Sequence, residues 1–160
     1  DHEALILRPK PGHDNATPSG NGVAALALQR LGHLVGEARY LDAAERTLRL
    51  FQDAMERQPS AYSTLLTALD ECLAPPRFVV LRGSTRDLEP WRQALAAIYR
   101  PDTLVLSIPT ESADLPEVLD KPVPPTGVNA WLCEGVSCGP PIAALSDLKR
   151  LFDSGAATGA

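Results

Sequence analysis

The hydrophobic residues between positions 22 and 35 predict a helix that is apolar on nearly every side. Its apolar members are Val23, Ala24, Ala25, Leu26, Ala27, Leu28 and Leu31. Only Gln29 and Arg30 interrupt them before Gly32. A helix without a polar face is a buried helix, and burying this one needs more neighbours than 160 residues obviously supply. Because the chain also begins without Met, we interpret it as the C-terminal piece of a larger protein.

The next two helices are predicted to bury one face each. The first begins near Asp42, where Asp42 and Glu45 have the spacing of a capping box. Its apolar stripe consists of Leu41, Ala44, Leu48, Phe51 and Met55. After Gln58-Pro59-Ser60, a helix over Ala61–Leu73 carries the stripe Tyr62, Leu65, Leu66, Leu69 and Leu73. Helices of this kind, joined by short turns, are typical of stacked helical hairpins.

After Pro75-Pro76 the hydrophobic pattern changes to that of short strands. The β-branched runs Phe78–Leu81 and Thr103–Ile108 flank a predicted helix over Leu88–Tyr99, which Asp87 is expected to cap. This order predicts two parallel strands joined by a right-handed crossover. The remaining expected elements are a helical turn at Asp114–Leu119, a third strand at Val128–Cys133 and a closing helix at Ala143–Phe152.

Together these elements predict an α+β fold. Helical hairpins fill residues 1–75, and a small α/β unit with a short, mainly parallel sheet fills residues 76–153. The 15 prolines concentrate between the elements and mark the connections. Residues 154–160 are small and polar, and we expect them to form a disordered tail.

Charge and cysteine content narrow the classes of partner. The net charge is −5 and the basic residues are scattered, which argues against a nucleic acid or an anionic membrane as partner. No apolar run approaches the roughly 18 residues of a membrane span. Three cysteines, an odd number, fit reduced thiols better than a secreted disulfide framework. We therefore expect a cytoplasmic protein.

The polar loop before the first helix holds the first candidate site. Asp14, Ser19 and Asn21 precede a buried helix, whose free N–H groups and partial positive charge favour anionic or hydroxyl-rich ligands. This predicts a small polar ligand that donates hydrogen bonds to Asp14. The alternative is that Ser19 and Asn21 cap the helix, while Asp14 accepts hydrogen bonds from loop amides.

Cys133 and Cys138 form the second candidate site, a redox pair. Their C-x4-C spacing allows a small disulfide, but it is neither the C-x2-C redox motif nor half of a zinc site. Two inert thiols are the alternative, because unpaired cysteine usually behaves as a small buried hydrophobic residue. Cys72, on a predicted helix stripe, is assigned to the core.

The sequence indicates no metal site, no cofactor and no complete catalytic constellation. Gly83-Ser84 follows a predicted strand but lacks the further residues of a nucleotide-binding loop. Glycoside hydrolysis needs two facing carboxylates, and Asp14 is the one carboxylate in a convincing position for a site.

Three segments carry a family resemblance: RPKPGHDNATPSGNGVAAL, SAYSTLLTALDECLAPPRFVVLRG and NAWLCEGVSCGPPI. They resemble the C-terminal region of thioredoxin-domain-containing proteins related to spermatogenesis-associated protein 20, over roughly residues 5–152. The family pattern D-x-A-x-P-S-G-N matches Asp14, Ala16, Pro18, Ser19, Gly20 and Asn21, and the family's paired cysteines match Cys133 and Cys138.

The resemblance implies two domains upstream of this region. One is a thioredoxin-like domain, and the other is a helical (α/α)6 toroid similar to that of N-acylglucosamine 2-epimerases and six-hairpin glycosidases. Residues 1–75 would form the last hairpins of that toroid. Loops at one end of such toroids line a central cavity, which favours a ligand site that includes Asp14, Ser19 and Asn21.

Three hypotheses about function follow. In the leading one the chain is non-catalytic, and the larger protein binds a sugar- or polyol-like ligand or a protein client. In the second, that protein is a carbohydrate isomerase or hydrolase whose acid and base residues lie upstream. In the third, the chain is a redox accessory in which Cys133 and Cys138 exchange electrons with the thioredoxin-like domain. We also expect the isolated chain to self-associate, since its first helix lacks its toroid neighbours.

Overall fold

The computed structural model of the protein describes residues 9–135 and 137–154. Within it the chain forms two compact units, a helical unit from Asp1–His33 and Glu37–Ala74, and an α/β unit from Leu34–Gly36 and Pro75–Ala160. Of the expected disordered tail, Ser154 ends the last helix, and residues 155–160 lie outside the described part. Among the described residues, no helix is long and apolar enough to cross a lipid bilayer.

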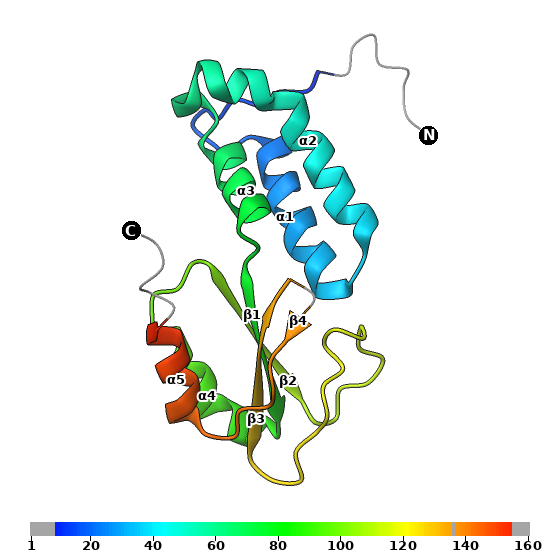
Figure 1. Cartoon of the computed structure of the whole chain (residues 1–160), viewed down its shortest axis with the longest axis vertical. Helices are drawn as coiled ribbons and strands as arrows, with labels where there is room; N and C mark the ends of the chain where they lie inside the picture. The colour runs from blue at the N-terminus through cyan, green and yellow to red at the C-terminus, as the bar shows by residue number, and fades with distance from the viewer. Residues whose placement is uncertain (1–8, 136, 155–160) are drawn as a thin grey trace. The chain divides into compact units, whose positions relative to one another are not determined.

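Three helices build the helical unit (Figure 1). They are α1 (Gly20–Val35), α2 (Ala38–Arg57) and α3 (Ser63–Leu73), with the short 3₁₀ helix η1 (Pro59–Ala61) before α3. Their shared core consists of Ala25, Ala44, Leu48, Met55, Leu65 and Ala68. This arrangement confirms the predicted succession of three helices with short connections.

The capping box predicted at Asp42 is wrong, because α2 begins four residues earlier. Gly36 has a positive φ of 71° and directly follows α1, which ends at Val35. The N–H of Glu37 then donates to the carbonyl of Gly32 at 3.0 Å, so the chain turns at once into α2. Glu37 precedes α2 without a side-chain capping bond. Asp42 consequently lies inside the helix.

The helix α1, which was expected to need more neighbours than this chain supplies, is packed over only part of its surface. Its buried positions are Gly22, Ala25, Gln29 and Gly32. A Cβ on Gly22 would lie 2.9 Å from Cβ of Thr64, so the absence of a side chain permits this close approach to α3. On the other side, Val23 is 48% exposed and Leu31 is 40% exposed. One face of the helix is packed and another is open.

A four-stranded sheet forms the centre of the α/β unit. The strands are β1 (Arg77–Gly83), β2 (Thr103–Pro109), β3 (Val128–Glu134) and β4 (Ser137–Cys138), in the order β2-β1-β3-β4. The predicted parallel pair of β1 and β2 is present. β3 runs antiparallel to β1, and β4 antiparallel to β3. The α+β class is therefore confirmed, but the sheet is mixed rather than mainly parallel.

The connection between β2 and β3 explains the antiparallel strand. β2 ends beside Gly83, and β3 starts opposite the same residue, since Val128 pairs with Gly83. Residues 110–127 therefore leave and re-enter at the same end of the strands, and a parallel strand would need a crossover to the opposite end. The helical turn expected at Asp114–Leu119 is a hydrogen-bonded turn in which the N–H groups of Leu119 and Asp120 donate to Pro116.

The two faces of the sheet have different coverings. Helices α4 (Thr85–Ala96) and α5 (Leu145–Ser154) pack on one face through Leu88, Leu95, Leu148 and Phe152 (Figure 1). The other face carries Phe78, Val80, Ile108, Trp131 and Cys133, against which Leu115 and Leu119 of the connection pack. The N-cap of α4 is Ser84, whose Oγ accepts from the N–H of Asp87 at 3.2 Å, and not Asp87 as predicted.

Candidate functional site

The carboxylate of Asp14 organises the loop before α1. Its Oδ1 accepts a hydrogen bond from the N–H of Ser19 and its Oδ2 accepts one from the N–H of Thr64, both at 2.7 Å. Ser19 directly precedes α1, and Thr64 lies in the first turn of α3. The N–H of Asp14 donates to the carbonyl of Ala61, also at 2.7 Å. One carboxylate therefore joins the N-terminal ends of two helices.

These contacts also set the charge of Asp14. Burial raises the pKa of this carboxyl group, but the hydrogen bonds from Thr64 and Ser19 outweigh burial and hold the pKa below its ordinary value. The N-terminal ends of α1 and α3 add partial positive charge. Asp14 is thus ionised at neutral pH. It occupies the place where an external anion would meet these two helix ends.

The side chains of Ser19 and Asn21 likewise join the loop to α1, of which Asn21 is the second residue. Oγ of Ser19 accepts from the N–H of Gly22 at 3.1 Å, which makes Ser19 the N-cap of α1. Nδ2 of Asn21 donates to the carbonyl of Pro11 at 2.7 Å. The structure brings Asp14 and Ser19 together and uses all three predicted site residues to hold the loop. Their direct contact with a ligand stays a prediction.

Two polar side chains that interrupt the apolar sequence of α1 bind α3. Nε2 of Gln29, a residue that is 3% exposed, donates to the carbonyl of Ala68 at 2.8 Å. The guanidinium of Arg30 donates to the carboxylate of Glu71, with Nε 2.9 Å from Oε2, and this hydrogen bond raises the pKa of Arg30. This interface was not predicted from the sequence, although the two polar positions in an apolar helix indicate it.

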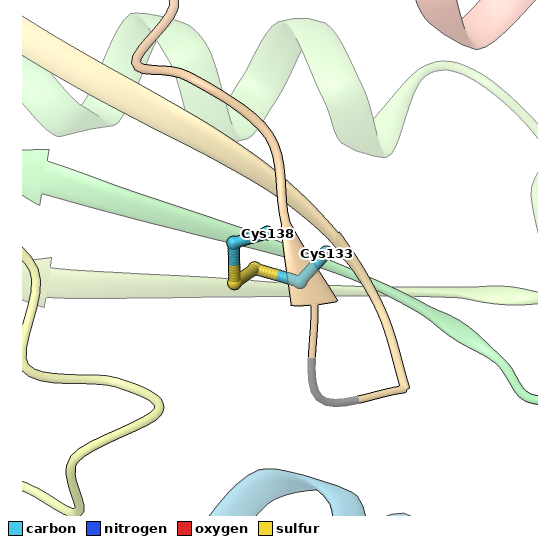
Figure 2. Close-up of a disulfide and its surroundings, with 2 residues drawn as sticks. All are labelled: Cys133 and Cys138. Carbon is cyan, nitrogen blue, oxygen red and sulfur yellow. A yellow bond between two sulfur atoms is a disulfide. The ribbon is translucent and has the colours of Figure 1, made fainter.

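Cys133 and Cys138 are joined by a disulfide between β3 and β4 (Figure 2). The two residues are opposite each other in the antiparallel register, and their Cα atoms are 4.0 Å apart. The interpretation of two inert thiols is therefore wrong for this pair, and the C-x4-C spacing closes a small disulfide hairpin. We call residues 133–138 the disulfide hairpin.

The two cysteines of the disulfide hairpin have different surroundings. Cys133 is 0% exposed and belongs to the apolar cluster with Phe78, Val80 and Trp131. Cys138 is half-buried and packs against the edge of this cluster. Nε of Arg77 donates to the carboxylate of Glu134 at 2.8 Å, which ties the start of the hairpin to β1. One sulfur-bearing residue is thus enclosed, and the other reaches the surface.

The third cysteine, Cys72, was predicted to lie in the core, and this prediction is wrong. Cys72 is a free, exposed thiol. It lines a groove of about 420 Å³ between α2 and α3, together with Leu48, Met55, Leu66, Leu69 and Leu73, and with charged residues of α2 at the rim. Because α3 ends at Leu73, its last turn has fewer neighbours than the stripe pattern implied.

The described residues offer no group of three His, Cys, Asp or Glu side chains that could hold a metal ion. The features that remain are a helical unit with one open apolar face and an α/β unit with a cross-strand disulfide. These features define an α+β protein with a cross-strand disulfide.

Comparison with known proteins places this chain beside one named group. It is 26% identical over 158 residues to human spermatogenesis-associated protein 20, and 27% identical over 155 residues to the rat protein of that name. Each match covers 92% of this chain and 20% of the relative, so the chain spans about one fifth of the length of the curated relatives it matches. No protein-family model and no solved structure matches.

These similarities support a relation to the family named by the resemblance. The thioredoxin-like domain and the toroid that the resemblance implies stay predictions.

Proposed function

We propose that this chain is a non-catalytic packing region of a larger protein, in which further helices of that protein cover the open face of α1. The proposal rests on one observation: α1 is apolar on nearly every side, but the structure covers only one of its sides. Val23 and Leu31 are 48% and 40% exposed. The chain matches one fifth of the length of the human relative, which supports the presence of further chain in the larger protein.

The composition of the open face supports a helix as its occupant. Val23, Ala24, Ala27 and Leu31 are exposed, and their spacing places them along one side of α1. No charged residue occurs in α1 before Arg30. Alanine permits close approach of a second backbone, and the lack of charge favours an apolar partner over a polar ligand. A second helix meets both requirements.

The ligand of the larger protein is proposed to be sugar- or polyol-like, or a protein client. In this proposal Asp14 acts by holding the loop, because both its oxygens already accept backbone hydrogen bonds. The isomerase or hydrolase hypothesis gains no residue from the described part of the chain. A thermal-shift screen of sugars on the larger protein tests the ligand class, and a shift that is identical in Asp14→Ala would remove this loop from the site.

The packing proposal is tested by the association state of the isolated chain. We expect light scattering to show concentration-dependent self-association, because the open face of α1 then meets a second copy. The double variant V23E/L31E should be monomeric with unchanged helix content. Leu50→Glu is the matched control, since Leu50 is an exposed apolar residue of α2 at 57%. A monomeric wild-type chain at all concentrations would contradict the proposal.

The second candidate function is that of a redox accessory, and the disulfide of the hairpin favours it. A cross-strand pair with one half-buried cysteine can be reduced and reoxidised without unfolding the sheet, since β3 is also paired with β1. We expect the pair to equilibrate reversibly with a dithiol buffer, as measured by alkylation and mass spectrometry. A disulfide that stays intact in the native chain under excess dithiol would exclude this role.

A further inference from the structure

The two disulfide-bonded cysteines are unequally exposed. Thiol–disulfide exchange requires a thiolate to reach one sulfur while the other leaves. Cys133 has no exposed surface, and the side chains of Phe78, Val80 and Trp131 share its cluster. Cys138 retains exposed surface. Access therefore favours attack at Cys138.

The strands that carry the two cysteines also favour attack at Cys138. Cys133 lies in β3, where it pairs with Phe78 of β1 on one side and with Cys138 on the other. Cys138 lies in β4, which consists of Ser137 and Cys138 at the edge of the sheet. An attacked residue must move to accommodate a mixed disulfide, and the short edge strand can move at lower cost than β3.

The pattern of backbone hydrogen bonds leaves the disulfide as the direct link between Cys138 and Cys133. The N–H of Gly139 donates to the carbonyl of Leu132 at 2.9 Å, so these two residues form a hydrogen-bonded pair. In an antiparallel ladder the adjacent pair, Cys133 and Cys138, is then a non-hydrogen-bonded pair. The sulfur–sulfur bond is the direct link between them. Once it is broken, the flanking residue pairs still hold Cys138 near Cys133, while its side chain is free to bond to a partner.

Resting on the redox role proposed above, we propose that exchange begins at Sγ of Cys138 and that the partner is a dithiol. A thiolate of the dithiol bonds to Sγ of Cys138 while the bond to Sγ of Cys133 breaks. Cys133 leaves with the electron pair and takes up a proton. The second thiol of the partner then attacks the partner's first sulfur, which is bonded to Cys138 in the mixed disulfide, and releases Cys138 as a thiolate. The partner is oxidised to a disulfide, and Cys133 and Cys138 become two thiols.

The requirement for a dithiol follows from the position of Cys133. In the mixed disulfide its sulfur still lies beside Cys138, and it can expel the partner in an intramolecular step at high effective concentration. A monothiol would be expelled before a second molecule arrives. A dithiol carries its own second thiol and resolves the intermediate by an intramolecular step as well.

Trp131 supplies an optical readout of this reaction. It shares the apolar cluster of Cys133 and Cys138, and a nearby disulfide quenches indole fluorescence. Trp91, the other tryptophan, packs in the cluster on the opposite face of the sheet. In a Trp91→Phe variant, reduction should therefore raise the remaining fluorescence.

The first experiment traps the attacked sulfur. A dithiol protein whose resolving cysteine has been replaced is added to the Cys72→Ser chain, acid quenching stops the exchange before Cys133 expels the partner, and the mixed disulfide is mapped by peptide mass spectrometry. The proposal expects the adduct on Cys138, and an adduct on Cys133 would overturn it. As an independent arm, C133S should leave a thiol that iodoacetamide alkylates in the native chain, whereas the thiol of C138S should react only after unfolding. Equal alkylation rates would also contradict the proposal.

The second experiment compares dithiothreitol with 2-mercaptoethanol at equal thiol concentration, followed by Trp131 fluorescence. We expect reduction by dithiothreitol to be at least about 100-fold more effective, because its resolving step is intramolecular. Equal efficiency would overturn the dithiol requirement. Failure of dithiothreitol to reduce the native pair would instead refute the redox role itself, so the two failures are distinguishable.

Discussion

The helical unit and the α/β unit are stabilised in different ways. In the helical unit the packed face of α1 carries Gly22, Ala25, Gln29 and Gly32, and side-chain hydrogen bonds fix it to its neighbours. In the α/β unit β1 is buried from Phe78 to Gly83, with large apolar side chains on both faces of the sheet. The stability of the first unit therefore has a polar, pH-dependent component in addition to its apolar core, whereas that of the second depends mainly on packed volume.

The largest expected effect is that of a cavity in the α/β unit. Leu81 is 0% exposed in the cluster beneath α4 and α5, so Leu81→Ala should lower the free energy of unfolding of this unit by about 3 kcal/mol. Chemical denaturation followed by Trp131 fluorescence measures it. Val105→Ala, at a position 37% exposed on β2, is the control and should change little. A loss under about 1 kcal/mol would contradict a volume-dependent core.

Removal of the disulfide is expected to have the next largest effect. The bond closes the short loop of residues 133–138, and the loss of that constraint on the unfolded chain should cost about 2 kcal/mol. The C133A/C138A double variant, compared with wild type under oxidising and reducing conditions, isolates the contribution. Wild type under reducing conditions should approach the double variant in stability. Equal stability of the oxidised wild type and the double variant would show that the disulfide does not stabilise the folded chain.

Asp14→Ala tests the polar contribution to the stability of the helical unit. It removes two charge-assisted hydrogen bonds between helix ends in a partly exposed site, and we expect a loss of about 1.5 kcal/mol from the helical unit. Asp53→Ala, on the exposed face of α2, is the control for loss of one negative charge. Hydrogen exchange of the α1 and α3 amides locates the effect. Unchanged exchange at the first turn of α3 would contradict the role of Asp14.

The same residue gives the helical unit a pH dependence. The pKa of Asp14 is lower in the folded chain than its ordinary value of 3.8. Its stabilising contribution is therefore fully present above that ordinary value and is lost as the pH falls through the folded pKa. Unfolding measured between neutral and acidic pH should show this loss in wild type and not in Asp14→Ala. Identical acid profiles of the two proteins would refute it.

The smallest effect concerns the cap of α4. Ser84→Ala removes the acceptor for the N–H of Asp87 and should cost about 1 kcal/mol, measured by denaturation of the α/β unit. Thr85→Ala, one residue further on, retains the cap and is the matched control. A larger loss of stability in Thr85→Ala than in Ser84→Ala would show that Ser84 is not the N-cap.

The sequence predicted the elements better than their surroundings. Periodicity located the helices and three strands, because apolar spacing reports which residues face a core. It did not predict the direction of β3, since residues 110–127 contain no periodic signal for where they return. Ser84 was missed although Ser84 and Asp87 have the capping-box spacing, because Asp87 stood closer to the first apolar residue.

The candidate site shows the same limit. Polar residues before α1 were found from sequence, but their partners are backbone groups such as the N–H of Thr64, 50 residues away, which no local pattern reveals. Cys72 followed the stripe of α3 and is nevertheless exposed, because the end of a helix has fewer neighbours than its middle. The spacing of Cys133 and Cys138 allowed a disulfide, whereas the register that joins them belongs to the folded sheet.

The most direct test of the packing role measures access to the open face of α1. A Leu31→Cys thiol in a Cys72→Ser background is labelled with a maleimide in the isolated chain at low concentration and in the larger protein. We expect rapid labelling in the isolated chain and labelling at least about 100-fold slower in the larger protein, where local opening must precede reaction. Equal rates in the two proteins would contradict it.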